Sequence, residues 1–139
     1  RSIWAMISME TRKPADLLTL HGGSIVDYVC VKDCPIDKPG RIKVSHPELV
    51  GECQVKYSDI DLNGHVNSIK YIEHILDLFP MEMFREKRIR RFEMAYVAES
   101  YYGDTLSFYR EQTGENEYDV EVKKNGSEVV VRSKVIFRD

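Results

Sequence analysis

The sequence predicts an α+β fold in which one amphipathic helix packs against an antiparallel β-sheet. Two patterns predict this fold: a helical repeat of apolar residues begins near residue 69, and segments of alternating apolar and polar residues follow it. In residues 117–124, for example, Tyr118, Val120 and Val122 alternate with charged side chains. A period of two is typical of antiparallel strands with one face in the core and one face in solvent. We therefore expect the helix to cover the apolar face of the sheet.

The predicted helix follows residue 67 and ends before Pro80. Asn67 or Ser68 can cap its start through a side-chain oxygen, and Pro80 stops it because proline has no backbone N–H group. At about 100° per residue, the apolar side chains cover roughly half of the helical cylinder, which predicts a mostly buried helix. These side chains belong to Ile69, Tyr71, Ile72, Ile75, Leu76, Leu78 and Phe79. His74 falls on the polar side and is expected to be solvated.

The remaining elements are one strand before the helix and four strands after it. Residues 51–57 form the first strand, and residues 81–86 add a short helical turn after the helix. The later strands are residues 89–100, 104–112, 117–124 and 128–138. Asn125-Gly126 predicts a two-residue hairpin turn between the last two strands. We expect the four later strands to form an antiparallel meander, and this order of elements matches the hotdog fold, in which a curved sheet wraps a long central helix.

The composition is that of a soluble globular domain. The chain has 139 residues, of which 42% are hydrophobic and 31% are charged, and its net charge is -3. This weakly acidic balance does not predict nucleic acid as a partner. No apolar run approaches the roughly 20 residues of a membrane span. Cys30, Cys34 and Cys53 lack a strong metal-ligand spacing, and no nucleotide fingerprint is present. We therefore expect inert thiols in a reducing cytoplasm, with no cofactor and no metal.

The polar side chains best suited to chemistry lie directly before the helix. Asp61, Asn63 and His65 alternate within five residues, so the sequence brings a carboxylate, an amide and an imidazole to the helix N-terminus. We expect the backbone N–H groups near Gly64 and Val66 to face a developing oxyanion. This arrangement suits hydrolysis of an acyl compound. Taken singly, each residue also has a structural interpretation, as a turn residue or as a hydrogen-bonded structural histidine.

Three segments together resemble the acyl-acyl carrier protein thioesterases of plants and bacteria. Residues 58–72 resemble the active-site loop and helix of that family. The matching residues are Asp61, Asn63, His65, Val66, Asn67, Lys70 and Tyr71. Residues 92–100, FEMAYVAES, resemble the family strand that ends in a functional glutamate, here Glu99. Residues 2–14 resemble the last strand of the first hotdog domain in the family and the start of the interdomain linker.

The resemblance implies a domain organisation, because family members carry two hotdog domains in tandem. Residues 1–10 are then the last strand of a preceding hotdog domain, and residues 47–139 are a complete second one. Residues 11–46 are the interdomain linker, which agrees with their prolines and glycines and their lack of sustained periodicity. We expect the chain to be a fragment, completed by a second hotdog domain of the same protein or, alternatively, by a homodimer.

The resemblance also implies site residues, namely Asp61, Asn63, His65 and Glu99. Our hypothesis is that Glu99 or His65 activates a water molecule, Asn63 positions the water or the carbonyl group, and Asp61 orients its neighbours. Plant members of the family carry a cysteine directly after the glutamate, where this chain has Ser100. This difference favours attack by water over a covalent thiol mechanism.

The function implied by the resemblance is hydrolysis of fatty acyl-acyl carrier protein to free fatty acid, which ends fatty acid synthesis in a bacterial cytoplasm. Two alternatives stay open: an acyl-CoA thioesterase of the single-hotdog type with Asp61 as the main carboxylate, and a non-catalytic domain that binds acyl chains or the carrier. A basic run contains Lys87, Arg88, Arg90 and Arg91. It is a candidate docking patch for the acidic carrier protein, although basic residues at the start of a strand are also common as solvated side chains.

Overall fold

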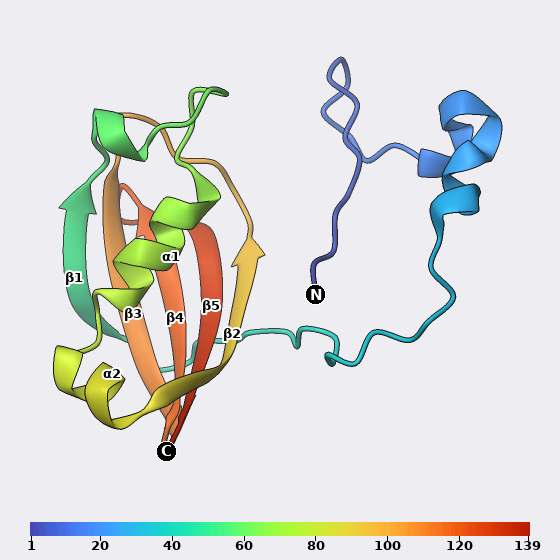
Figure 1. The fold of residues 1–139 in the computed structure, drawn as a ribbon. Helices are drawn as coiled ribbons and strands as arrows, with labels where there is room; N and C mark the ends of the chain where they lie inside the picture. The colour runs from blue at the N-terminus through green and yellow to red at the C-terminus, as the bar shows by residue number, and fades with distance from the viewer. The chain divides into compact units, whose positions relative to one another are not determined.

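The computed structural model describes residues 1–139, which divide into the units Arg1–Gly40 and Arg41–Asp139. The second unit is an α+β domain with one five-stranded antiparallel sheet (Figure 1). Its strands are β1 (Glu48–Gln54), β2 (Arg88–Tyr96), β3 (Thr105–Gly114), β4 (Glu117–Lys124) and β5 (Glu128–Arg138). The helix α1 (Ser68–Leu76) crosses one face of the sheet, and α2 (Met81–Glu86) follows it. This arrangement confirms the predicted hotdog fold.

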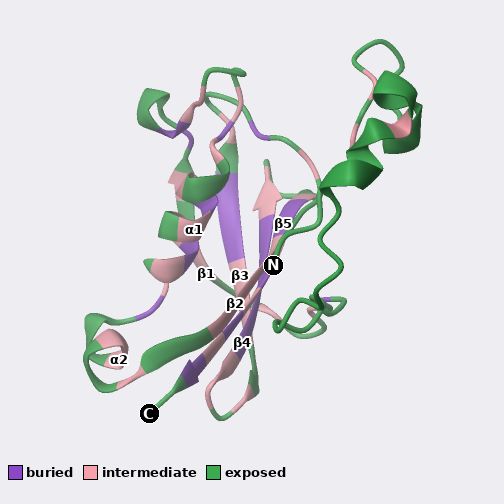
Figure 2. Ribbon diagram, turned by 45° about the vertical axis from the view of Figure 1, so that its right-hand side comes forward, coloured by how far each residue is buried: buried purple, intermediate pink, exposed green.

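The core lies between α1 and the sheet face beneath it, where Figure 2 shows the buried residues gathered on β3 to β5. Ile75 from α1 and Leu106, Val120 and Val135 from the sheet are completely buried, at 0% exposure. Phe79, just after α1, packs its ring against aromatic rings of the sheet. Valine and aromatic side chains suit this surface, because branched and flat groups pack well on a pleated sheet.

The start of α1 agrees with the sequence, but its end and its burial do not. Asn67 caps the helix as predicted, since its Oδ1 accepts a hydrogen bond of 2.9 Å from the N–H group of Ile69. The helix ends at Leu76. The prediction of a mostly buried helix is wrong, because α1 contacts the sheet with one face only. Ile69 is accordingly 55% exposed, although it belongs to the predicted apolar arc.

The predicted bounds are confirmed for the strands β4 and β5 and for the helix α2. They differ by one or two residues for β3 and by more for β1 and β2. Strand β1 lies three residues earlier than expected because the 3-10 turn η2 (Tyr57–Asp59) occupies the end of the predicted segment. Strand β2 ends before Val97 because the N–H groups of Val97 and Ala98 both donate to the carbonyl of Val130, at 2.8 and 3.2 Å. Glu99 therefore lies on a loop, not at the end of the strand.

The predicted four-stranded meander is wrong for β2. The sheet order is β1-β3-β4-β5-β2, so β2 pairs with β5 at the edge of the sheet, not with β3. The loop of residues 97–104 crosses the end of the sheet to the start of β3 (Figure 1). It is held there by Val55, whose N–H group donates to the carbonyl of Asp104 at 2.9 Å. This crossing brings Glu99 close to the polar loop before α1.

The face of the sheet opposite α1 is less exposed to solvent than the alternating pattern predicts. Asp119 and Glu121 of β4 were expected in solvent, yet they are only 4% and 8% exposed. Lys134 of β5 lies 3.1 Å from a carboxylate oxygen of Asp119, and Arg132 donates a 2.8 Å hydrogen bond to Glu121. The alkyl parts of these long side chains cover the strand while their charged groups pair with the carboxylates.

The segment before β1 belongs to the second unit. Ile42 is buried, at 7% exposure. The N–H groups of Ser45 and His46 donate to one carboxylate oxygen of Glu111 on β3, at 2.6 and 3.2 Å. These contacts attach residues 41–46 to the sheet domain.

The unit Arg1–Gly40 contains no buried residue. Within residues 1–10, where a strand is predicted, the structure has only a single β-bridge, between Ile7 and Pro14. The 3-10 segment η1 (Leu17–Tyr28) is interrupted at residues 20–23. In neither unit does any helix combine the length and the apolar character needed to cross a bilayer.

Candidate active site

A tight loop between η2 and α1 presents the predicted polar residues. Ile60 and Val66 form an antiparallel bridge across its base, and the N–H group of Asp61 donates to the carbonyl of His65 at 3.0 Å. At its tip, Gly64 has a positive φ of 82°, a conformation that a residue with a Cβ rarely adopts. The hydrogen bonds and the turn hold residues 61–65 in a compact arrangement.

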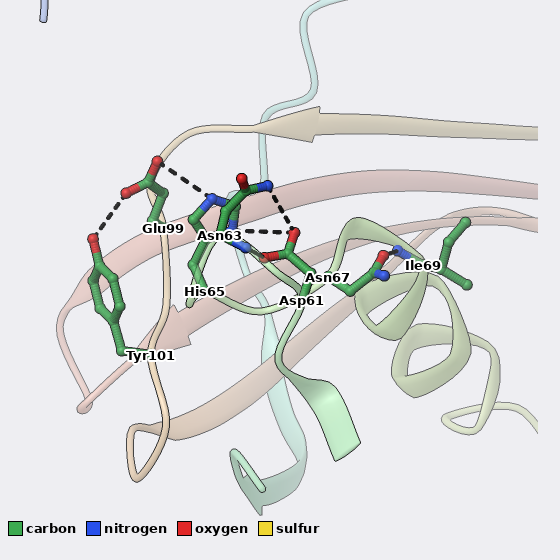
Figure 3. A network of polar contacts seen from close by, with 7 residues as sticks. All are labelled: Asp61, Asn63, His65, Asn67, Ile69, Glu99 and Tyr101. Carbon is green, nitrogen blue, oxygen red and sulfur yellow. Dashed lines mark hydrogen bonds and ion pairs between the residues drawn. The ribbon is translucent and has the colours of Figure 1, made fainter. Parts of the chain in front are cut away.

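Asp61 organises this loop through both of its carboxylate oxygens (Figure 3). Oδ1 accepts a 2.8 Å hydrogen bond from the backbone N–H of Asn63, and Oδ2 accepts a 3.4 Å hydrogen bond from the Asn63 side-chain amide. Oδ2 also lies 3.7 Å from Nδ1 of His65. Desolvation disfavours the charged carboxylate, but the hydrogen bonds from Asn63 and the nearby imidazole together lower the pKa of Asp61 below its usual 3.8. Asp61 is therefore ionised at neutral pH.

The imidazole of His65 lies between two carboxylates, one from each loop (Figure 3). Nδ1 faces Asp61, and Nε2 lies 4.0 Å from Oε1 of Glu99. At 4.0 Å two such atoms do not share a direct hydrogen bond, but a single water molecule about 2.8 Å from each can contact both. The structure thus brings together all four predicted residues, Asp61, Asn63, His65 and Glu99.

The backbone N–H groups of Gly64 and Val66, the predicted oxyanion donors, already have acceptors within the chain. The N–H group of Gly64 donates to the carbonyl of Asp61 at 3.1 Å, and that of Val66 donates to the carbonyl of Ser100 at 2.8 Å. An N–H group that already has an acceptor cannot serve an oxyanion unless that hydrogen bond breaks. The Val66–Ser100 hydrogen bond instead ties the polar loop to the loop that carries Glu99. The backbone N–H of His65 is directed to the carboxylate of Asp61 and is one of the groups that lower its pKa.

The side chain of Ser100 faces the interior. Its exposure is 0%, and it lies beside the buried side chain of Tyr71. Burial raises the pKa of Tyr71, and the neighbouring Ser100 hydroxyl offsets only part of this effect. Ser100 therefore contributes its backbone carbonyl, but not an accessible hydroxyl, to this part of the molecule.

Sequence reasoning missed two features next to the site. Tyr101 donates a 2.8 Å hydrogen bond to Oε2 of Glu99 (Figure 3), a contact that no local pattern indicates because it depends on the course of the crossing loop. His74 was expected in solvent, but its Nε2 lies 3.5 Å from Oδ1 of the buried Asp59 and its ring lies 6.0 Å from that of Phe108. Asp59 of η2 and Phe108 of β3 meet His74 only in three dimensions, so the helical pattern alone could not predict this.

An open hollow of about 640 Å³ adjoins the polar loop. Asp61 and Asn63 contribute polar groups to its wall, and Tyr57, Ile60 and Leu62 contribute apolar groups. A mixed surface of this kind can hold a substrate that has both polar and apolar parts. No group of three or more histidine, cysteine, aspartate or glutamate side chains is arranged to hold a metal ion.

The basic run does not form one continuous patch. Lys87 donates a hydrogen bond to Asn116 and lies 3.9 Å from a carboxylate oxygen of Asp139, and Arg91 pairs with Glu93. Arg88 and Arg90 are exposed and have no ion pair. The register shift between Ile89 and Arg91 makes Arg90 an extra residue in the edge strand, a bulge that sets it apart from its neighbours.

Comparison with known proteins identifies similar sequences and structures. Residues 43–138 match the family model of the acyl-ACP thioesterase C-terminal domain. The chloroplastic dodecanoyl-[acyl-carrier-protein] hydrolase of Cinnamomum camphora is 32% identical over 103 residues, which are 70% of this chain and 27% of that protein. The chain thus spans only about a quarter of the length of this curated relative.

Two solved structures are similar over 95% of this chain. An acyl-ACP thioesterase from Bacteroides thetaiotaomicron has a TM-score of 0.88 and 68% identity, and the match covers 53% of that chain. The 12:0-ACP thioesterase from Umbellularia californica has a TM-score of 0.75 and 22% identity, and the match covers 52% of that chain. The present chain therefore spans about half of each of these two proteins.

Proposed function

We propose, because this chain belongs to the acyl-acyl carrier protein thioesterase family, that the protein hydrolyses fatty acyl-acyl carrier protein to a free fatty acid and the carrier. Such a reaction would end fatty acid synthesis. The observation that carries the proposal is the placement of His65 between Asp61 and Glu99, at 3.7 and 4.0 Å. Hydrolysis of a thioester needs an activated water molecule and a donor for the oxyanion, and this site offers groups for both.

The attacking water would sit between Oε1 of Glu99 and Nε2 of His65. Its oxygen forms a bond to the thioester carbon while its proton passes to Glu99 or His65. The C–S bond then breaks, the sulfur leaves with the bonding electron pair, and the proton is returned to give the thiol. Asp61 keeps the imidazole oriented through Nδ1. The burial of Ser100 supports this route over covalent catalysis at that position, because a nucleophile must reach the carbonyl carbon.

The oxyanion would be held by the side-chain amide of Asn63. One N–H of the Asn63 amide already donates to Asp61, which fixes the amide plane and leaves its second N–H for the substrate. In the proposed mechanism this amide donor takes the place of the N–H groups of Gly64 and Val66, which already have acceptors.

The proposed carrier contact is restricted to Arg88 and Arg90. Both side chains are exposed without an ion pair, so they are available to an acidic partner. Charge reversal at both positions, Arg88→Glu with Arg90→Glu, should raise the KM for acyl-carrier protein by about tenfold and leave the KM for a small acyl thioester unchanged. Lys32→Glu with Lys43→Glu makes the same change in charge at two other exposed positions and serves as the control. Equal effects on both substrates would exclude docking at Arg88 and Arg90.

We further propose that the protein works in a bacterial cytoplasm with a second hotdog domain beside the one described here. The free cysteines Cys30, Cys34 and Cys53 fit a reducing compartment. The match to half of the Bacteroides protein supports a second domain in the same protein, with a homodimer as the alternative. Sedimentation of the full-length protein distinguishes these arrangements: a monomer with full activity supports the tandem domain, and an obligate dimer supports the homodimer.

The proposed function is tested by measuring thiol release from matched acyl-carrier protein and acyl-CoA substrates at several chain lengths. The protein should be extended upstream to its natural start. A higher kcat/KM for the carrier-bound substrates is the expected result. Activity on CoA esters alone would assign the protein to acyl-CoA hydrolysis, and release from neither substrate would leave only a binding role.

A further inference from the structure

Glu99 lies on a loop between two strands and not within a regular element. Strand β2 ends at Tyr96, and residues 97–104 cross the end of the sheet before β3 begins. The Glu99 side chain is 43% exposed, so burial does not restrict its rotamer. A reaction that needs one carboxylate oxygen beside His65 therefore requires another contact to orient the group.

Tyr101 makes a contact of this kind. Its phenolic Oη donates a 2.8 Å hydrogen bond to Oε2 of Glu99, while Oε1 of the same carboxylate lies 4.0 Å from Nε2 of His65. Figure 3 shows the Tyr101 hydroxyl and the His65 ring on different sides of the carboxylate. Because a carboxylate is planar and rigid, fixing Oε2 also fixes the direction of Oε1.

Tyr101 is itself fixed by two neighbouring residues. Its backbone N–H donates to Oδ2 of Asp104 at 2.9 Å, and its carbonyl accepts from the N–H of Asp104 at 3.1 Å. The ammonium group of Lys124 lies 5.7 Å from the centre of the Tyr101 ring and donates a 2.8 Å hydrogen bond to the backbone carbonyl of Glu99. Lys124 thus contacts both the ring that holds the carboxylate and the backbone that carries it.

We propose that Tyr101 is a positioning residue that holds Glu99 with Oε1 toward His65 and the attacking water. This inference rests on the proposed hydrolysis. The water proton passes to Oε1 or to His65, as described above, and the Tyr101 hydroxyl keeps its own proton throughout. Tyr101 therefore affects the rate through Glu99 alone.

The first test is Tyr101→Phe in the full-length protein, which removes the hydroxyl and keeps the ring. We expect kcat for acyl-carrier protein to fall by about tenfold, with KM and Tm unchanged, because in this proposal the hydroxyl acts by orienting Glu99. Tyr102→Phe is the matched control, since Tyr102 is 72% exposed and makes no hydrogen bond through its side chain. A kcat for Tyr101→Phe within about twofold of the control contradicts the inference.

The second test places Tyr101→Phe in a Glu99→Gln background, with enzyme in excess over substrate so that slow hydrolysis is measured. Tyr101→Phe should cause no further loss there, because the carboxylate through which it acts is gone. A loss of about tenfold in both backgrounds would show that Tyr101 acts independently of Glu99 and would overturn the inference. No hydrolysis by the unaltered protein would contradict the proposed function itself, and with it the inference.

Discussion

At the scale of single residues, His65 connects the two loops of the site. Its ring faces Asp61 on its own loop and Glu99 on the crossing loop. We expect His65→Ala to lower kcat/KM for acyl-carrier protein by about 10² or more, with little change in Tm, because the ring is partly exposed and not part of the core. His46→Ala removes an imidazole outside the site and should have no effect. Steady-state kinetics and thermal unfolding of both variants check this, and near-normal turnover by His65→Ala would remove it from the mechanism.

The sequence predicted the four polar residues but not their hydrogen-bond partners. Asp61, Asn63 and His65 are close in sequence, so a local pattern could reveal them. The hydrogen bonds between Val66 and Ser100 and between Tyr101 and Glu99 depend on the path of the loop of residues 97–104. A local pattern does not show the path of that loop, and this is why the acceptor of the Val66 N–H group could not be predicted and Tyr101 was missed.

At the scale of elements, α1 attaches the site to the core through one face. Ile75 is 0% exposed, whereas Ile69, also in the predicted apolar arc, is 55% exposed. We expect Ile75→Ala to lower the free energy of unfolding by about 2–5 kcal/mol through lost contacts and the cavity left behind. Ile69→Ala deletes the same atoms at a partly exposed position and should cost well under half as much. Urea denaturation of the two variants gives both values, and equal losses would mean that α1 is buried on both sides.

The segment before β1 is held by a carboxylate, which makes its attachment dependent on pH. Hydrogen bonds from the N–H groups of Ser45 and His46 outweigh desolvation and lower the pKa of Glu111 below its usual 4.5. A carboxylate with a lowered folded pKa stabilises the fold above its unfolded pKa, and the contribution is lost as pH falls through the folded value. Amide protection factors of Ser45 and His46 should therefore decrease below about pH 4.5.

The Glu111→Ala variant should show the same loss of protection at neutral pH, while Glu115→Ala, at an exposed position on the β3–β4 turn, should not. Hydrogen exchange measured by NMR separates the outcomes. Protection of Ser45 and His46 that is independent of pH and of Glu111 would show that other contacts hold the segment.

At the scale of the whole molecule, the elements were easier to predict than their order in the sheet. The bounds of β4 and β5 follow from alternation and from the Asn125-Gly126 turn, in which both residues have positive φ as such a turn requires. The pairing of β2 with β5 is a contact between segments distant in sequence, and the turn residues near Gly103 do not distinguish a hairpin from a crossing loop. The site depends on that distinction, because only the crossing loop brings Glu99 to His65.

The two units should also differ in resistance to proteolysis. The unit Arg1–Gly40 has no buried residue, and apolar side chains such as Trp4 and Met9 are 86% and 82% exposed. Without a core, its backbone opens at little free-energy cost, whereas the sheet domain must unfold cooperatively. We expect limited digestion of the 139-residue chain with chymotrypsin to cut within residues 1–40 first and to leave a stable fragment that contains residues 41–139. Mass spectrometry over a time course identifies the cuts.

The same digestion of the protein extended upstream to its natural start tests the assignment of residues 1–10 to a preceding hotdog domain. If these residues complete a strand in that domain, Trp4 becomes protected, because its backbone then hydrogen-bonds to a neighbouring strand and its side chain joins a core. Cleavage should then move to residues 11–40, which the linker assignment leaves exposed. Continued cleavage at Trp4 would mean that residues 1–10 belong to the linker and that the preceding domain is complete without them.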